Sequence, residues 1–75
     1  MSIDSDEFLK LMRDQFDHEK DRITMDQPFR NLQDWSSLQA LIVITTIDEA
    51  YDVTINEQEL QNAQTFGDLF TLVDT

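Results

Sequence analysis

The chain has 75 residues, of which 16 are acidic and 5 are Lys or Arg, so its formal net charge is -11, and it contains no cysteine. This length allows one small domain, 1–75, with a single core, and the scarcity of Gly and Pro favours helices over a small β-barrel. The charge disfavours nucleic acid and anionic membranes and favours a monomer with basic protein partners, while the missing cysteine excludes a disulfide, a thiolate nucleophile and a zinc-thiolate site.

A first helix is predicted from about Asp4 to Phe16. Its apolar residues recur at i, i+3, i+4 and i+8, which is the spacing of one helix face: Phe8, Leu11, Met12 and Phe16. Asp4 is the expected N-cap, and Glu7 has the capping-box position three residues later.

Residues 17–35 show no clear period and contain the only proline, Pro28. We expect a long ordered loop that includes a short helical turn, because loops of this length without internal structure are uncommon. Trp35 is interpreted as an anchor of this loop rather than as a binding aromatic. The apolar side chains expected to hold the loop on the core are Ile23, Met25, Phe29, Leu32 and Trp35.

The second helix is predicted from Ser37 to about Ala50 or Tyr51, with Ser36 as its cap, because Ser36 and Gln39 form the capping-box sequence S-x-x-Q. Its β-branched residues would also suit a strand, but its length, its cap and its lack of alternation favour a helix. One apolar stripe contains Ala40, Val43, Ile44, Ile47 and Tyr51, and a second contains Leu38, Leu41, Ile42 and Thr45. A helix that is apolar on two sides is expected to be central and buried.

Two shorter helices complete the pattern. Asn56 caps the third, with Glu59 in the capping-box position, and Ile55 and Leu60 hold the positions of a hydrophobic staple. The fourth begins after Thr65 and has one apolar face, made of Phe66, Leu69, Phe70 and Val73. We therefore predict an all-α fold, a small four-helix bundle with a short third helix and a long loop between helices one and two.

Candidate catalytic and metal-binding groups are sparse. The acidic residues of 48–59 are expected to form a solvated surface, not a cleft with shifted pKa values. This interval has the length of an EF-hand loop, but Ala50 and Val53 stand where a ligand and the turn glycine are required, so no calcium site is expected. His18, the only histidine, is expected at the surface, and we predict neither a metal site nor an enzyme.

The location of the chain follows only by default. Its start, MSIDSDEF, lacks the basic-then-apolar order of a secretion signal. No apolar run approaches the ~20 residues of a membrane span. We therefore expect a cytoplasmic protein.

Ser37 is the residue to which the sequence assigns chemistry. Because Ser36 supplies the cap, the Ser37 hydroxyl is free, and a phosphodiester on it would lie at a helix N-terminus, which favours anions. An apolar stripe with an acidic rim beside it has the composition of a docking surface for a protein partner. The residues of this surface are Asp34, Leu38, Leu41, Ile42, Thr45, Asp48, Glu49 and Asp52.

These features resemble the acyl carrier proteins. The family's Asp-Ser-Leu motif before an apolar helix is similar to Trp35-Ser36-Ser37-Leu38. The acidic end of its second helix, with an aromatic residue and a later Ile, resembles residues 48–55, and the start of its fourth helix resembles residues 65–70. The similarity extends from about residue 3 to residue 73.

The resemblance implies that a phosphopantetheinyl transferase attaches 4′-phosphopantetheine to Ser37. The terminal thiol of this arm then holds acyl groups as thioesters and presents them to acyl-loading and acyl-processing enzymes. The pathway implied is fatty acid, polyketide or related specialised biosynthesis. Ser36 stands where the family usually has Asp, which makes it a rival attachment site; Ser37 is preferred because it directly precedes Leu38. Gln39 and Ile42 replace acidic residues usual on the docking helix, which favours specialised partners and a dedicated pathway. An alternative hypothesis is a non-catalytic helical adaptor that uses the same surface without a cofactor.

Overall fold

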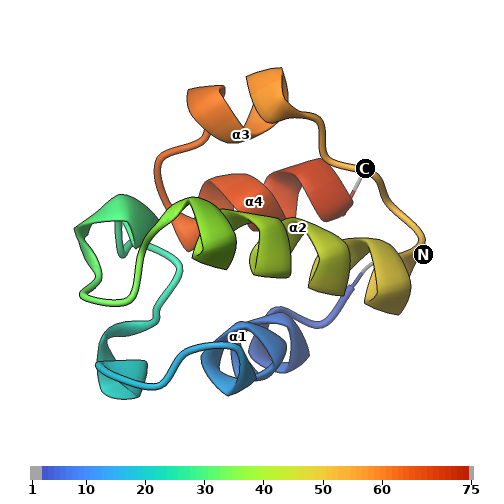
Figure 1. Ribbon diagram of the computed structural model, residues 1–75. Coiled ribbons are helices and arrows are strands. Elements are labelled where there is room, and N and C mark those ends of the chain that lie inside the picture. Colours follow the sequence, from blue (N-terminus) through green and yellow to red (C-terminus); the bar gives the residue numbers. More distant parts are fainter. Residues whose placement is uncertain (1–2, 75) are drawn as a thin grey trace.

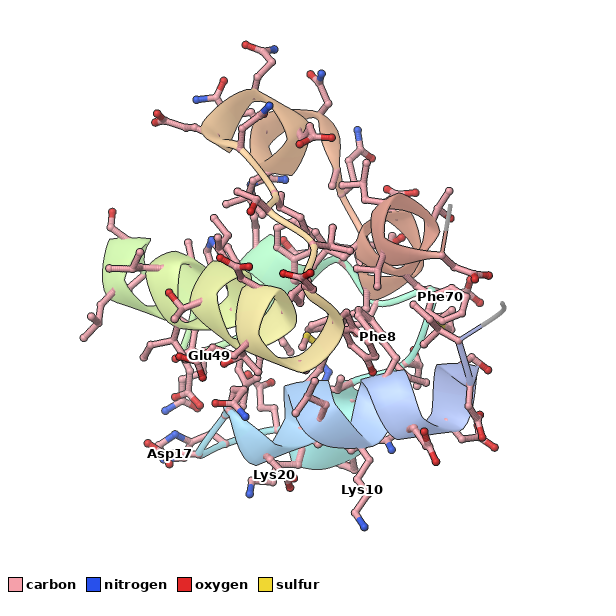
Figure 2. The ribbon with its side chains drawn as sticks, turned by 90° about the vertical axis from the view of Figure 1, so that its right-hand side faces the viewer. Phe8, Lys10, Asp17, Lys20, Glu49 and Phe70 are labelled. Atoms are coloured by element: carbon pink, nitrogen blue, oxygen red, sulfur yellow. The ribbon has the colours of Figure 1, made fainter. Side chains whose placement is uncertain are left out.

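The computed structural model describes residues 3–74, and these form helices and loops. The elements are α1 (Ser5–Asp14), the 3-10 turns η1 (Lys20–Arg22) and η2 (Phe29–Asn31), α2 (Ser37–Tyr51), α3 (Glu57–Asn62) and α4 (Phe66–Val73). In both views α1 and α3 lie on opposite sides of the molecule, with α2 and α4 between them (Figures 1 and 2). The prediction of an all-α bundle with a short third helix and a long first loop is confirmed.

Helix α1 is shorter than predicted. Asp4 is its N-cap, but its carboxylate accepts the N–H of Asp6 at 2.9 Å, so the capping box expected with Glu7 is wrong. The helix ends at Asp14 because the next N–H groups bond three residues back, which tightens the last turn. Phe16 therefore lies outside the helix, although it is buried as predicted.

Aromatic rings fill the core. The fully buried phenylalanines are Phe8, Phe16, Phe29 and Phe66. The Phe66 ring lies edge-on to both Phe16 and Phe29, with centroids 5.9 and 6.0 Å away. Phe8 of α1 faces Phe70 of α4 at 5.4 Å (Figure 2). Each such pair adds about 0.5–1.5 kcal/mol beyond area burial, so α4 holds α1 and the long loop together.

The long loop is fixed by backbone pairing with the start of α4. The N–H groups of Phe66 and Gly67, which have no partner within their helix, donate to the carbonyls of Gln27 (3.3 Å) and Met25 (2.8 Å). Phe29 donates in turn to the carbonyl of Gln64 at 3.2 Å. All five predicted anchors of the loop lie in the core or against it: Ile23, Phe29 and Leu32 are buried, and Met25 and Trp35 pack on them. The prediction of an ordered loop with a helical turn is confirmed.

Arg30 caps the C-terminus of α3. Its guanidinium donates to the carbonyls of Ala63 at 2.6 Å and Leu60 at 2.7 Å, which are unpaired groups at the end of α3. It also lies 4.7 Å from the centre of the Phe29 ring. A side chain of the long loop thus caps the C-terminus of α3, a role that the sequence did not reveal.

Helix α3 begins with the cap that the sequence predicts, and α4 begins after Thr65 as predicted. Asn56 and Glu59 form a complete capping box at α3, and Thr65 and Asp68 form another at α4. Both residues of the α3 staple are buried, namely Ile55 and Leu60. Local sequence signals therefore suffice for these two helix starts.

Helix α2 buries only one of its two apolar stripes. Val43 and Ile47 are buried, whereas Leu38 and Leu41 are 67% and 60% exposed. The expectation of a helix buried on both sides is wrong, because the other helices lie to one side of α2 and none covers its outer face (Figure 2). The exposed Leu38 and Leu41 of the predicted docking surface lie on this outer face.

Gly67 gives a direct test of the contact between the loop and α4. A Cβ at this position would lie 2.9 Å from the backbone oxygen of Met25, which is too close for carbon. We expect Gly67→Ala to destabilise the protein by about 1–3 kcal/mol in urea unfolding. Helix propensity alone would make the variant more stable by up to about 1 kcal/mol. The sign of the change in the free energy of unfolding therefore shows which effect is larger. Gln58→Ala, an exposed helix position, is the control and should stay within about 0.5 kcal/mol.

Candidate functional site

Two adjacent serines at the start of α2 have different places in the helix. Ser36 has an extended backbone and caps the helix, and its Oγ accepts the N–H of Gln39 at 3.1 Å. Ser37 is the first helical residue and is exposed. The predicted cap and the predicted helix bounds are confirmed. Both serines are exposed, and Ser37 lies at a helix N-terminus, where unpaired N–H groups and the helix dipole favour an anion.

Gln39 has a different role from the one predicted. It does not complete the capping box; its side-chain amide donates to the carbonyl of Gln15 at 2.8 Å. Gln15 is the C-cap residue of α1, so this bond ties the first turn of α2 to the end of α1. Gln39 is only 8% exposed, and its buried amide needs this partner.

An open hollow of about 320 Å³ lies beside Ser37. It is lined by Arg30, Trp35, Ser36, Ser37, Ala40, Glu57, Leu60 and Gln61. Its apolar lining includes the ring of Trp35, which rests 4.7 Å from that of Phe29. The lining also includes one cationic and one acidic side chain, Arg30 and Glu57.

The exposed face of α2 begins at the residue directly after Ser37. Leu38 and Leu41 are exposed, Thr45 is exposed and Ile42 is half-buried. The two exposed leucines are three residues apart, which is the spacing of neighbours on one helix face. The structure therefore brings together the four apolar docking residues predicted from the sequence.

The acidic end of α2 costs stability. Asp48 and Glu49 are exposed in its last turns, and Asp52 ends the helix in a left-handed conformation, with φ 56°. Negative charge at a helix C-terminus opposes the helix dipole, and the last turn of α2 has no basic residue. These acids therefore do not stabilise the end of the helix on which they lie.

Asp34 lies apart from this acidic group. Its carboxylate accepts the N–H groups of Asp17 and His18, both at 2.8 Å, and contacts the His18 Nδ1 at 2.7 Å. The hydrogen bond to the imidazole is the main reason that the pKa of Asp34 is lowered. Asp34 is thus engaged within the chain, at the loop after α1, and does not project freely beside the apolar face. The pairing spans 16 residues, so no local signal predicts it.

Within residues 3–74, no group of His, Asp and Glu side chains is arranged to hold a metal ion. No helix in that same range is long and apolar enough to cross a membrane. Residues 48–51 belong to α2, so they do not form the loop of an EF-hand.

The family described as "Phosphopantetheine attachment site" matches residues 6–73. A curated protein of Exiguobacterium sibiricum, named "Acyl carrier protein", is 25% identical over 57 residues, which are 76% of this chain and 72% of that protein. No solved structure matches the chain.

The different positions of the two serines predict different costs on substitution. Ser36→Ala removes the oxygen that accepts the N–H of Gln39, so we expect a loss of about 1 kcal/mol in the free energy of unfolding. Ser37→Ala removes an exposed hydroxyl and should change it by less than about 0.5 kcal/mol. Urea unfolding followed by circular dichroism measures both. Equal losses would contradict the assignment of Ser36 as the cap.

Proposed function

The chain belongs to the phosphopantetheine attachment family of acyl carrier proteins, and from that premise we propose that Ser37 bears its 4′-phosphopantetheine arm. Members of this family carry acyl groups and are not catalysts, and their prosthetic group is attached covalently. The observation that supports Ser37 is its place as the exposed first residue of α2, next to a serine whose side chain already caps the helix. Ser36 is the weaker candidate because its oxygen accepts the capping bond.

The residues around Ser37 suit a phosphodiester and the arm beyond it. The backbone N–H groups of the first turn of α2 favour the phosphate. The charges of Arg30 and Glu57, which both line the hollow, offset each other. Trp35, Ala40 and Leu60 offer apolar contact to the arm. When attached, the arm supplies the thiol that this chain lacks and that holds the acyl group as a thioester.

The pathway is inferred to be a dedicated one. The carrier role fits fatty acid, polyketide or related specialised biosynthesis in a cytoplasmic monomer. On α2, Ile42 contributes apolar surface where an acidic residue is usual, and Gln39 is turned inward to α1. These departures support specialised partners with an apolar contact near Ser37.

Loading of the arm is the direct test. The protein is incubated with coenzyme A and a broad-specificity phosphopantetheinyl transferase, and its intact mass is measured. We expect a gain of one phosphopantetheine in the wild type and in Ser36→Ala, and none in Ser37→Ala. A second carrier protein that this transferase is known to load, added to the same reaction, controls for transferase activity.

The outcomes separate the alternatives. A gain retained in Ser37→Ala and lost in Ser36→Ala would make Ser36 the attachment site. No gain in the wild type, with the control protein loaded, would favour an adaptor that binds partners through the same surface without a cofactor.

The docking surface is proposed to have two zones along α2. The exposed Leu38 and Leu41 lie in the first two turns, and the exposed Asp48 and Glu49 lie about 10–16 Å further along the axis. All five Lys and Arg residues precede residue 31, so the sequence from α2 onward has no basic side chain. We infer that partners, the transferase included, present an apolar contact opposite the first zone and basic groups opposite the second.

Charge reversal tests the second zone. Asp48→Lys should slow association with the transferase on the order of tenfold at low salt and reduce its salt dependence. The change agrees with the helix dipole, so the fold of α2 should not suffer. Asp14→Lys, at the end of α1, makes the same reversal elsewhere and should have little effect. Equal slowing by both variants would assign the effect to net charge rather than to this zone.

A further inference from the structure

The loop after α1 closes onto the segment that leads into α2. The Asp34 carboxylate accepts the N–H groups of Asp17 and His18 through Oδ2, while its Oδ1 lies 2.7 Å from the His18 Nδ1. The Asp34 side chain is only 16% exposed, whereas that of His18 is 57% exposed. We call this group of three residues, Asp17, His18 and Asp34, the clasp.

A second carboxylate fixes the same two segments. Glu19 accepts the N–H of Gln33 at 2.6 Å through Oε1 and pairs with Arg22 at 2.7 Å through Oε2. Glu19 has a φ of 55°, a left-handed conformation that costs energy for a residue other than glycine. Such a backbone persists only where its surroundings impose it, so the loop is held in this shape by its contacts with residues 33–34.

The clasp lies immediately before the site. Asp34 precedes Trp35, whose ring lines the hollow beside Ser37 and packs on Phe29. Gln39 joins α2 to the carbonyl of Gln15, so the start of α2 is anchored on the loop after α1 from both sides of Ser37. A change in the clasp therefore acts on the backbone that carries Trp35, Ser36 and Ser37.

We propose that Asp34 is a positioning residue for Ser37, which holds the entrance to α2 through the clasp, and that the charge of His18 makes this hold dependent on pH. The proposal rests on Ser37 as the attachment site. It assigns to Asp34 an intramolecular role, in place of the docking role predicted from its position beside the apolar stripe.

The direction of the pH dependence follows from the charges around the imidazole. These are Asp34 from the facing segment and Asp17 and Glu19 from its own loop; Arg22 is paired with Glu19. The hydrogen bond with Asp34 is the largest cause of a raised His18 pKa, followed by the charge of Asp34. Because the folded-state pKa is raised, the contribution of the charged pair is complete below the ordinary histidine pKa and is lost as the pH rises through the raised value. The two backbone bonds to Asp34 remain, so the clasp weakens but does not open.

The chain carries its own reporters for this test. His18 is the only histidine and Trp35 the only tryptophan, so imidazole NMR signals and tryptophan emission each report one residue. We expect the emission of Trp35 to change with the same midpoint as the His18 titration. Asp34→Ala should lower the His18 pKa toward its ordinary value, and His18→Gln should abolish the change in emission. An emission that is constant across the His18 titration would overturn the proposal.

Loading by the transferase measures the effect on Ser37. Asp34→Ala should be loaded on the order of tenfold more slowly, since small displacements of a reacting group have large effects on rate. Asp34→Asn keeps an acceptor for the backbone and should recover part of the rate without the pH dependence. The ratio of wild-type to His18→Gln rates, taken with the same transferase at each pH, should fall toward one as His18 loses its proton.

Two controls exclude a general loss of stability or charge. Asp68→Ala removes a carboxylate that accepts two backbone N–H groups at α4, so it is matched in kind but distant in sequence. Asp26→Ala removes one exposed charge from the same loop. Both should load at the wild-type rate, and an equal slowing in either one would overturn the proposal. A wild-type protein that is not loaded contradicts the proposed function. In that case the His18 titration and the emission of Trp35 still test whether the clasp responds to pH.

Discussion

The need of every helix end for hydrogen-bond partners governs this fold. Helix α3 has six residues and α4 has eight, which is too short for either to be stable alone. The long first loop supplies what they lack: Arg30 binds the last carbonyls of α3, and the carbonyls of Met25 and Gln27 accept the first N–H groups of α4. With Phe29 buried against Phe66, the loop is a structural part of the bundle rather than a connection between its helices.

The same requirement explains why Ser37 is available. Ser36 accepts an N–H at the start of α2, and the Gln39 amide donates to a carbonyl at the end of α1. The neighbouring Ser37 is therefore not needed as the cap and lies exposed beside a hollow of mixed polarity. The outer face of α2 then departs from what stability favours, with exposed leucines in its first turns and acids against the helix dipole at its end. These departures coincide in one surface, as expected where function rather than folding selects the residues.

Signals close together in sequence predicted most of this structure. The caps Ser36, Asn56 and Thr65 each bond a residue three positions later, and a short pattern contains both partners. The side-chain contacts that were missed join distant residues: Arg30 reaches α3 across 30 to 33 positions, Gln39 reaches α1 across 24, and Asp34 reaches His18 across 16. Periodicity placed the end of the first helix at Phe16 because a buried residue keeps its spacing even where the helix has already ended.

The central claim is that the phosphodiester lies on Ser37 and leaves the capping oxygen of Ser36 intact. Fragmentation mass spectrometry of the loaded protein tests it, because cleavage between residues 36 and 37 separates the two candidates. The account predicts that fragments ending at Ser36 have their unmodified mass and that the fragments beginning at Ser37 carry the whole arm. An arm found on the fragments that end at Ser36 would contradict it.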